Sequence, residues 1–118
     1  MVTGPYAPDR GDLVWLDFTP QAGHEQAGRR PALVLSLAAY NKKIGLMLCC
    51  PVTNQVKGYP FEVAVVAASG PGNGPATGVV LADQMRCLDW QARKASKFAS
   101  VTLQCVLDVS AKVKLLLP

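Results

Sequence analysis

The sequence predicts a single α+β domain that is mainly β, a small barrel or sandwich closed by one C-terminal helix. Short apolar runs follow one another at close intervals and are separated by Gly- and Pro-rich breaks. Only the C-terminal stretch changes to helical spacing. The 118 residues are half hydrophobic, which is enough for one core but not for two. No repeat or linker divides the chain, so residues 1–118 are expected to form one domain.

Three strands are expected in the first half of the chain. Gly11 to Phe18 carries large side chains on both faces, and a proline and two glycines then end it in a long loop. Pro31 to Ser36 and Gly45 to Val52 are the next apolar runs of strand length. Ala38 to Lys43 should form a short turn or one helical turn between them.

The second half contains shorter elements. Phe61 to Ala68 is a further apolar cluster, and the Gly- and Pro-rich residues 69–78 must form a loop or a wide hairpin. Val79 to Leu81 and Gln84 to Leu88 are consistent with two short strands. From Thr102, a suitable N-cap, apolar residues recur near helical spacing, and lysines near the end favour the helix dipole. This pattern predicts one amphipathic helix against a β core.

The charge balance favours a polyanionic partner. Twelve Lys and Arg against eight Asp and Glu give a net charge of +4, with a pI near 9.0. The N-terminus lacks the charged and apolar regions of a signal peptide, and no apolar run approaches the roughly 20 residues of a membrane-spanning helix. Nucleic acid is therefore favoured over membrane, and a cytoplasmic location is expected.

The four cysteines do not predict a metal site. Cys49, Cys50, Cys87 and Cys105 follow no ligand spacing, and the chain has one histidine and no C-x-x-C motif. In a reducing cytoplasm they are expected to be small buried hydrophobic residues. Neither a metal nor a cofactor is predicted.

The stretch from Gly23 to Leu35 is the densest group of polar chemistry, directly before a predicted buried strand. A loop anchored to a rigid element is a common place for binding and catalytic groups. Pro31 biases Arg30 to an extended conformation, so a guanidinium suited to phosphate is held at the mouth of a strand. Taken alone, His24 and Glu25 would be better explained as a solvated turn, and their neighbours are what favour a site.

Further polar side chains stand where predicted strands end. Thr53 closes an apolar run, and Lys57 and Tyr59 follow it closely. Asp83 and Gln84 lie between two short strands. An ordinary strand end and a hairpin turn are the simpler explanations for these two groups. The basic stretch 86–97 surrounds a tryptophan and fits either a solvated face or a nucleic-acid backbone contact.

Together these residues resemble the MazF/PemK (Kid) family of toxin-antitoxin ribonucleases. The matching blocks are Gly-His-Glu-Gln-Ala-Gly-Arg-Arg-Pro-Ala-Leu-Val-Leu-Ser, Pro-Val-Thr, Lys-Gly-Tyr-Pro-Phe-Glu-Val and Thr-Gly-Val-Val-Leu-Ala-Asp-Gln, in family order from about Pro8 to the last residue. The resemblance implies an SH3-like barrel of the CcdB/PemK type, a homodimer and a metal-independent endoribonuclease. It also implies a single-stranded RNA substrate, inhibition of translation and growth, and neutralisation by a cognate acidic, MazE-like antitoxin.

In such chemistry the ribose 2′-hydroxyl attacks the neighbouring phosphorus and leaves a 2′,3′-cyclic phosphate and a 5′-hydroxyl. A base, an acid and charge-stabilising donors are needed. The resemblance implies that Arg30 and Thr53 stabilise charge and hydrogen-bond the phosphate, and that Glu25 is a candidate base. His24 and Asp83 are similar to the histidine and aspartate that the PemK branch uses.

Two positions depart from the family patterns. Leu81 stands where the PemK branch has a catalytic arginine, and Arg29 stands where the MazF branch often has a histidine. The division of acid and base roles therefore stays open. A guanidinium keeps its proton at neutral pH, which favours Arg30 as a stabiliser, whereas a histidine such as His24 titrates in the useful range.

A set of aromatic, amide and cationic residues is expected to contact RNA. These residues are Phe18, Gln26, Arg29, Lys57, Tyr59, Gln84 and Arg86. Phe18 and Tyr59 offer rings for base stacking, while the alternating neighbours of Phe61 favour a core position. An acidic antitoxin tail would compete for Arg29, Arg30 and Lys57.

Two other functions are compatible with the fold. One is a non-catalytic toxin such as CcdB, which poisons DNA gyrase by binding; the Arg-Pro and Thr motifs argue against it. The other is an SH3-like interaction module with an inert polar loop. Only the ribonuclease predicts RNA cleavage at a few short sites in the presence of EDTA.

Overall fold

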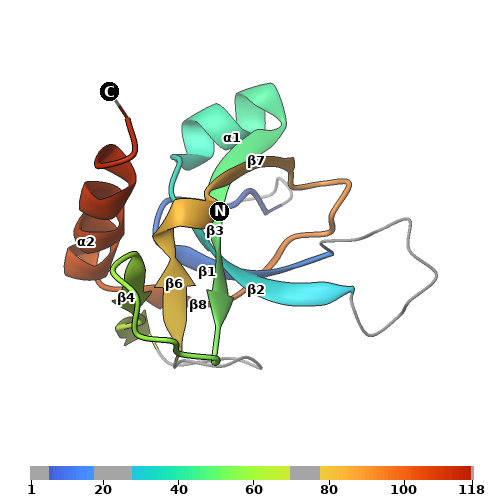
Figure 1. Ribbon diagram of the computed structural model, residues 1–118. Helices are drawn as coiled ribbons and strands as arrows, with labels where there is room; N and C mark the ends of the chain where they lie inside the picture. The colour runs from blue at the N-terminus through green and yellow to red at the C-terminus, as the bar shows by residue number, and fades with distance from the viewer. Residues whose placement is uncertain (1–5, 18–27, 70–77, 118) are drawn as a thin grey trace.

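The computed structural model describes residues 6–17, 28–69 and 78–117. These residues form an eight-stranded antiparallel sheet and two α-helices (Figure 1). The strands are β1 Asp12–Asp17, β2 Arg29–Val34, β3 Leu46–Thr53, β4 Glu62–Ala64, β5 Ala67–Ser69, β6 Val79–Leu81, β7 Arg86–Asp89 and β8 Ser96–Val101. The helices are α1 Ala38–Ile44 and α2 Leu103–Lys114, with a 3-10 turn at Ala82–Gln84.

The strand order is β4-β6-β3-β2-β1-β8-β5, and β7 pairs with β3 away from this path. Strand β3 organises the sheet because it changes partner along its length. Its start pairs with β7, its middle with β2, and its last two residues with β6. The sheet therefore curls around a core without closing. The predicted mainly-β α+β fold is confirmed as a barrel-like, open sheet.

Two apolar clusters form the core, and neighbouring strand residues alternate between them. Leu13 and Cys50 belong to the first cluster, whereas Val14 and Cys49 belong to the second. Helix α2 covers the first cluster with its four buried residues, Cys105, Val106, Val109 and Val113. The predicted N-cap is confirmed, since the Thr102 hydroxyl accepts a hydrogen bond from the Cys105 amide at 3.2 Å.

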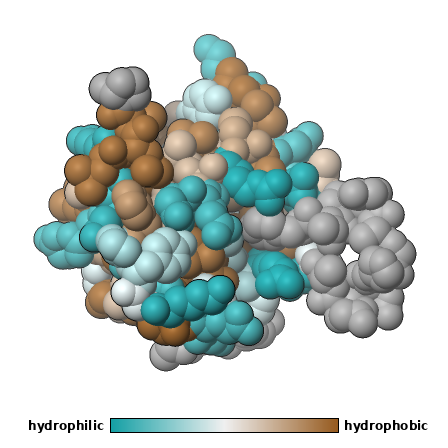
Figure 2. Space-filling model, in the orientation of Figure 1, coloured by the Kyte–Doolittle hydropathy of each residue, from teal (hydrophilic) through white to brown (hydrophobic). Residues whose placement is uncertain are grey.

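Helix α2 also leaves apolar side chains exposed. Figure 2 shows this apolar surface at the end of the molecule where α2 terminates. The exposed leucines of this segment are Leu103, Leu107, Leu115, Leu116 and Leu117. No helix in the described parts of the chain is long and apolar enough to cross a membrane.

Helix α1 is longer than the single turn that the sequence predicts, because a buried asparagine anchors it. The Asn41 side chain accepts from the Ser36 hydroxyl at 2.6 Å and donates to the Pro8 carbonyl at 2.8 Å. The Trp90 indole donates to the Asn41 carbonyl at 2.8 Å. These long-range partners stabilise a segment whose own sequence signal is weak.

Three further parts of the sheet differ from, or add to, what the sequence predicts. The apolar cluster Phe61 to Ala68 contains two strands, because the chain leaves β6 after β4 and pairs with β8 through β5. The strand expected from Gln84 begins at Arg86, after the 3-10 turn. Strand β8 was not predicted, since its first residues lie in the basic stretch.

The cysteine prediction is correct for three residues and wrong for one. Cys49, Cys50 and Cys105 are buried, but Cys87 is exposed. Among the described strands, β7 pairs with β3 alone, and Leu88 is its one buried residue. Cys87 therefore lies on an outward side of the sheet.

Thiol reactivity should follow this burial. Burial raises the pKa of the Cys49 and Cys50 thiols to about 12 and also raises that of Cys105. We expect one fast-reacting thiol per native chain in a DTNB assay, and four after unfolding in urea. Cys87→Ser should remove the fast phase. Two or more fast thiols in the native protein would contradict the described packing.

Candidate active site

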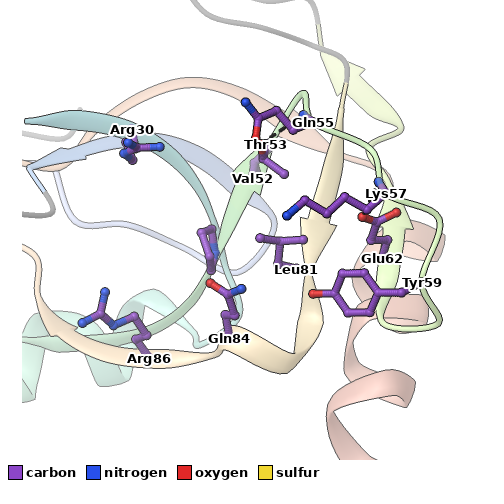
Figure 3. Close-up of a pocket in the computed structure, with 11 residues that line it drawn as sticks. Arg30, Val52, Thr53, Gln55, Lys57, Tyr59, Glu62, Leu81, Gln84 and Arg86 are labelled. Carbon is purple, nitrogen blue, oxygen red and sulfur yellow. Dashed lines mark hydrogen bonds between the residues drawn. The ribbon is translucent and has the colours of Figure 1, made fainter. Parts of the chain in front are cut away.

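A pocket of about 260 Å³ opens where β2, β3 and β6 approach one another. Its lining comes from strands, from the segment between β3 and β4, and from the 3-10 turn that contains Gln84. The lining residues are Arg30, Pro51, Val52, Thr53, Gln55, Lys57, Tyr59, Glu62, Leu81, Gln84 and Arg86. Figure 3 shows Arg30 and Arg86 on one side of the pocket and Lys57 and Tyr59 on the other. The lining carries three cations and one carboxylate, which favours an anionic ligand.

Strand register brings Arg30 and Thr53 together. Ala32 of β2 pairs with Pro51 of β3, so extending the register by two residues places Arg30 opposite Thr53. The Thr53 hydroxyl oxygen accepts a hydrogen bond from the Gln55 amide at 3.1 Å, which Figure 3 marks with a dashed line. Its hydroxyl hydrogen can still donate to a bound anion. A guanidinium and a hydroxyl donor thus face the same space.

A second hollow of about 340 Å³ adjoins the pocket. It shares Arg30, Val52 and Thr53 with the first and adds Trp15, Arg29, Pro31 and Asn54. Arg30 and Thr53 therefore stand between two hollows. An extended ligand could place its charged centre at these two residues and a flanking group on each side.

Glu62 holds the loop that presents Lys57. Its carboxylate accepts from the Lys57 amide at 2.9 Å and from the Gly58 amide at 2.8 Å. Gly58 has a φ of 81°, which a glycine adopts readily. Figure 3 shows the Lys57 side chain reaching from this turn across Leu81. Sequence reasoning assigned Glu62 no role, although the Lys-Gly-Tyr-Pro-Phe-Glu-Val block contains it.

Replacing Glu62 by alanine should loosen this turn. Two amide hydrogen bonds to a charged acceptor are lost, so we expect a decrease of about 1 kcal/mol in the free energy of unfolding. Hydrogen exchange at the Lys57 and Gly58 amides should accelerate. Urea unfolding and exchange measurements test this, with Asp108→Ala on α2 as the control. Equal behaviour of the two variants would contradict the anchoring role.

Tyr59 and Asp83 meet at the pocket edge. The Tyr59 hydroxyl donates to Asp83 Oδ1 at 2.9 Å. This hydrogen bond to Asp83, with smaller effects of desolvation and nearby carboxylates, raises the pKa of Tyr59. The phenol therefore stays protonated and remains a donor at neutral pH. Asp83 itself is exposed and outside the pocket lining, which includes its neighbour Gln84.

Residues 9–117 match the family model of PemK-like, MazF-like toxins of type II toxin-antitoxin systems. The chain belongs to this family. It is 48% identical over 112 residues to the endoribonuclease toxin MazF of Escherichia coli, covering 95% of this chain and 96% of that protein. It is 34% identical over 110 residues to the endoribonuclease PemK of Escherichia coli, covering 92% of this chain and 81% of that protein.

Solved structures of family members have the same fold. A crystal structure of MazF from Deinococcus radiodurans has a TM-score of 0.80 and 56% identity, covering 96% of this chain and 98% of that one. A crystal structure of MazE-MazF from the same organism has a TM-score of 0.79 and 50% identity, covering 96% and 97%. The resemblance inferred from the sequence blocks, including the fold, is confirmed.

The departure of this chain from the PemK branch lies inside the pocket. Leu81 lines it, and Figure 3 shows this side chain between Thr53 and Gln84. An apolar group thus occupies the position that the sequence resemblance compares with an arginine of the PemK branch. The remaining cations of the pocket are Arg30, Lys57 and Arg86.

The structure brings many of the predicted site residues to one place. Six of them line the pocket: Arg30, Thr53, Lys57, Tyr59, Gln84 and Arg86. Arg29 lines the second hollow, and its guanidinium bonds with Asp17 at 2.8 Å. Phe18, His24, Glu25 and Gln26 lie outside the described residues. Within the described ranges, no three His, Cys, Asp or Glu side chains cluster in a way that could hold a metal ion.

Proposed function

We propose that this chain is an endoribonuclease toxin that cleaves single-stranded RNA at short sequences without a metal ion. The observation that carries the proposal is the pairing of Arg30 and Thr53 between two hollows, with Lys57 and Arg86 at the rim. A phosphodiester at these residues would meet a permanent positive charge and a hydroxyl donor. The relatives named above as endoribonucleases support the same activity.

The proposed reaction is attack of the ribose 2′-hydroxyl on the adjacent phosphorus. The bond from phosphorus to the 5′-oxygen breaks, leaving a 2′,3′-cyclic phosphate and a 5′-hydroxyl. We assign stabilisation of the phosphorane to Arg30 and a hydrogen bond to a phosphate oxygen to Thr53. The guanidinium suits this role because it carries its charge at every relevant pH and can donate two parallel hydrogen bonds.

Proton transfer is assigned to His24 and Glu25, on the family resemblance. Asp83 is the third candidate, as the residue similar to the aspartate of the PemK branch. Its Oδ1 already accepts from Tyr59, so a further role is to orient that phenol. Tyr59 would then offer a fixed donor and a ring to a base beside the scissile phosphate.

The remaining proposed RNA contacts are cationic or amide side chains at the pocket rim. Lys57 and Arg86 would hold phosphates, and Gln84 would hydrogen-bond a base or ribose. RNA affinity should therefore fall with salt, with a slope of roughly 0.7 per phosphate contacted.

The proposed partners are a second copy of the chain and an acidic antitoxin, in the cytoplasm. The exposed leucines of α2 and of the residues directly after it offer apolar surface for a homodimer. An acidic antitoxin segment would compete with RNA for Arg30 and Lys57. Structures of MazE-MazF from Deinococcus radiodurans, and of a mycobacterial endoribonuclease with its cognate antitoxin, support a partner of this kind.

Incubation of the purified protein with RNA in EDTA tests the proposed function. An unstructured RNA should be cut at a few short sites, and the same RNA annealed to its complement should stay intact. Absence of cuts in both would refute the ribonuclease. Inhibition of gyrase supercoiling without RNA cleavage would instead support the CcdB-like alternative.

A further inference from the structure

Both terminal nitrogens of the Arg29 guanidinium donate to protein acceptors, which come from three segments. Its Nη1 donates to Asp17 Oδ1 at 2.8 Å. Its Nη2 donates to the Lys94 carbonyl at 2.9 Å and to the Ser96 hydroxyl at 3.1 Å. The Trp15 carbonyl lies at 3.4 Å from the same nitrogen. One side chain thus joins β1, β2 and the turn that leads into β8.

The turn that receives Arg29 has an unusual backbone. Lys94 has a φ of 56°, the one positive φ outside glycine among the described residues. A residue other than glycine rarely adopts this backbone conformation unless surrounding contacts hold it. Arg93 provides further contacts, since its backbone accepts from the Asp17 amide and its Nη1 donates to the Asp17 carbonyl, both at 2.9 Å.

This cluster lies at the base of the segment that carries Arg30. Asp17 and Arg29 are direct partners in the β1–β2 register, and the next pair is Leu16 with Arg30. Successive side chains of a strand point to opposite faces. Arg29 therefore points to the turn while Arg30 lines the pocket. Fixing Arg29 fixes the strand end from which Arg30 projects.

We propose that Arg29 is a positioning residue that, with Asp17, holds the end of β2 so that Arg30 faces the scissile phosphate. The inference rests on the proposed function and replaces the RNA contact that the sequence predicts for Arg29. A single exposed ion pair contributes little to stability. A guanidinium that donates to a carboxylate, a hydroxyl and a backbone carbonyl instead fixes the relative positions of these three groups, because its donors have a fixed planar arrangement.

Asp17→Asn distinguishes an RNA-binding role of Arg29 from a positioning role, because the two roles predict different changes in RNA affinity and cleavage rate. If Arg29 bound RNA, removal of the negative charge beside its guanidinium would tighten RNA binding and steepen the salt slope. If Arg29 positions Arg30, the single-turnover cleavage rate at saturating protein should fall about tenfold, because a misplacement of Arg30 by roughly 1 Å can cost up to about 10²-fold in rate. The Kd for an uncleavable 2′-O-methyl RNA and its salt slope should stay within about twofold of wild type.

Arg29→Lys is the second variant, because it keeps the charge but loses the planar fork. We expect it to match Asp17→Asn in rate and wild type in Kd. Asp108→Asn, which makes the same charge change on α2, should leave both quantities unchanged. All rates are measured at a temperature where thermal melting shows each variant fully folded, so a loss of folded protein does not enter the rate.

Hydrogen exchange gives a readout that is independent of activity. The amides of β2 should exchange faster in Asp17→Asn than in Asp108→Asn. Unchanged protection of β2, or tighter RNA binding with an undiminished rate, would overturn the positioning role. Failure of the wild-type protein to cut RNA would refute the proposed function alone. The exchange result would still show whether the contact between Asp17 and Arg29 holds the end of β2.

Discussion

Replacing Arg30 by alanine is expected to lower RNA cleavage by on the order of 10²-fold while leaving the fold intact. Arg30 is exposed and lines both hollows, so its removal leaves no cavity in the core. The charge that develops on the phosphorane loses its cationic partner. Single-turnover cleavage at saturating protein measures the loss, and circular dichroism with thermal melting checks the fold.

Two further variants serve as a comparison and a control for Arg30→Ala. Arg30→Lys keeps a positive charge without the paired donors, so its rate should fall between those of wild type and alanine. Arg10→Ala removes an exposed arginine far from the pocket in sequence and should cleave like wild type. Wild-type cleavage by a folded Arg30→Ala protein would remove Arg30 from the site.

Replacing Gly78 by alanine is expected to damage both stability and cleavage. Gly78 has a φ of 108°, and an added Cβ would lie 2.5 Å from the Thr53 carbonyl oxygen. Because backbone is on the other side of this contact, β3 or β6 must shift. The free energy of unfolding should fall by about 2 kcal/mol or more, from the strained backbone and the steric clash together. Displacement of Thr53 should lower the cleavage rate of the remaining folded protein.

Gly45→Ala is the matched control for this steric effect. Gly45 also has a positive φ, 85°, but an added Cβ would meet nothing within 4 Å. Its cost should therefore be the backbone term alone, about 1 kcal/mol, with normal cleavage. Urea unfolding and single-turnover rates compare the two. An equal loss of stability in both, with full activity, would show that Gly78 does not constrain Thr53.

The sequence predicts elements well where hydrophobic pattern and local caps agree. The Thr102 cap and the apolar spacing after it define α2, and the apolar run before Thr53 defines most of β3. The sequence predicts element boundaries poorly where the pairing partner of a strand determines its length. Strand β2 begins at Arg29 rather than at the expected Pro31, because Asp17 and Leu16 of β1 supply partners for the two arginines.

The candidate site shows the same division. Motif resemblance identified Arg30 and Thr53, but their closeness depends on the register between β2 and β3, which sequence does not specify. Glu62 was missed because its partners are backbone amides, which have no side-chain signature. The sequence predicts that Arg29 contacts RNA, because its acceptors at Lys94 and Ser96 are remote in sequence and cannot be recognised there.

The chemistry of the RNA ends tests the central claim most directly. The wild-type protein is incubated with RNA in EDTA, and the new 5′ ends are labelled with polynucleotide kinase, with and without prior phosphatase treatment. Attack by the 2′-hydroxyl predicts 5′-hydroxyl ends that label without phosphatase, together with 2′,3′-cyclic phosphates, and none of these products with Arg30→Ala. Ends that label only after phosphatase, or cleavage that requires added magnesium, would contradict the proposed reaction at Arg30 and Thr53.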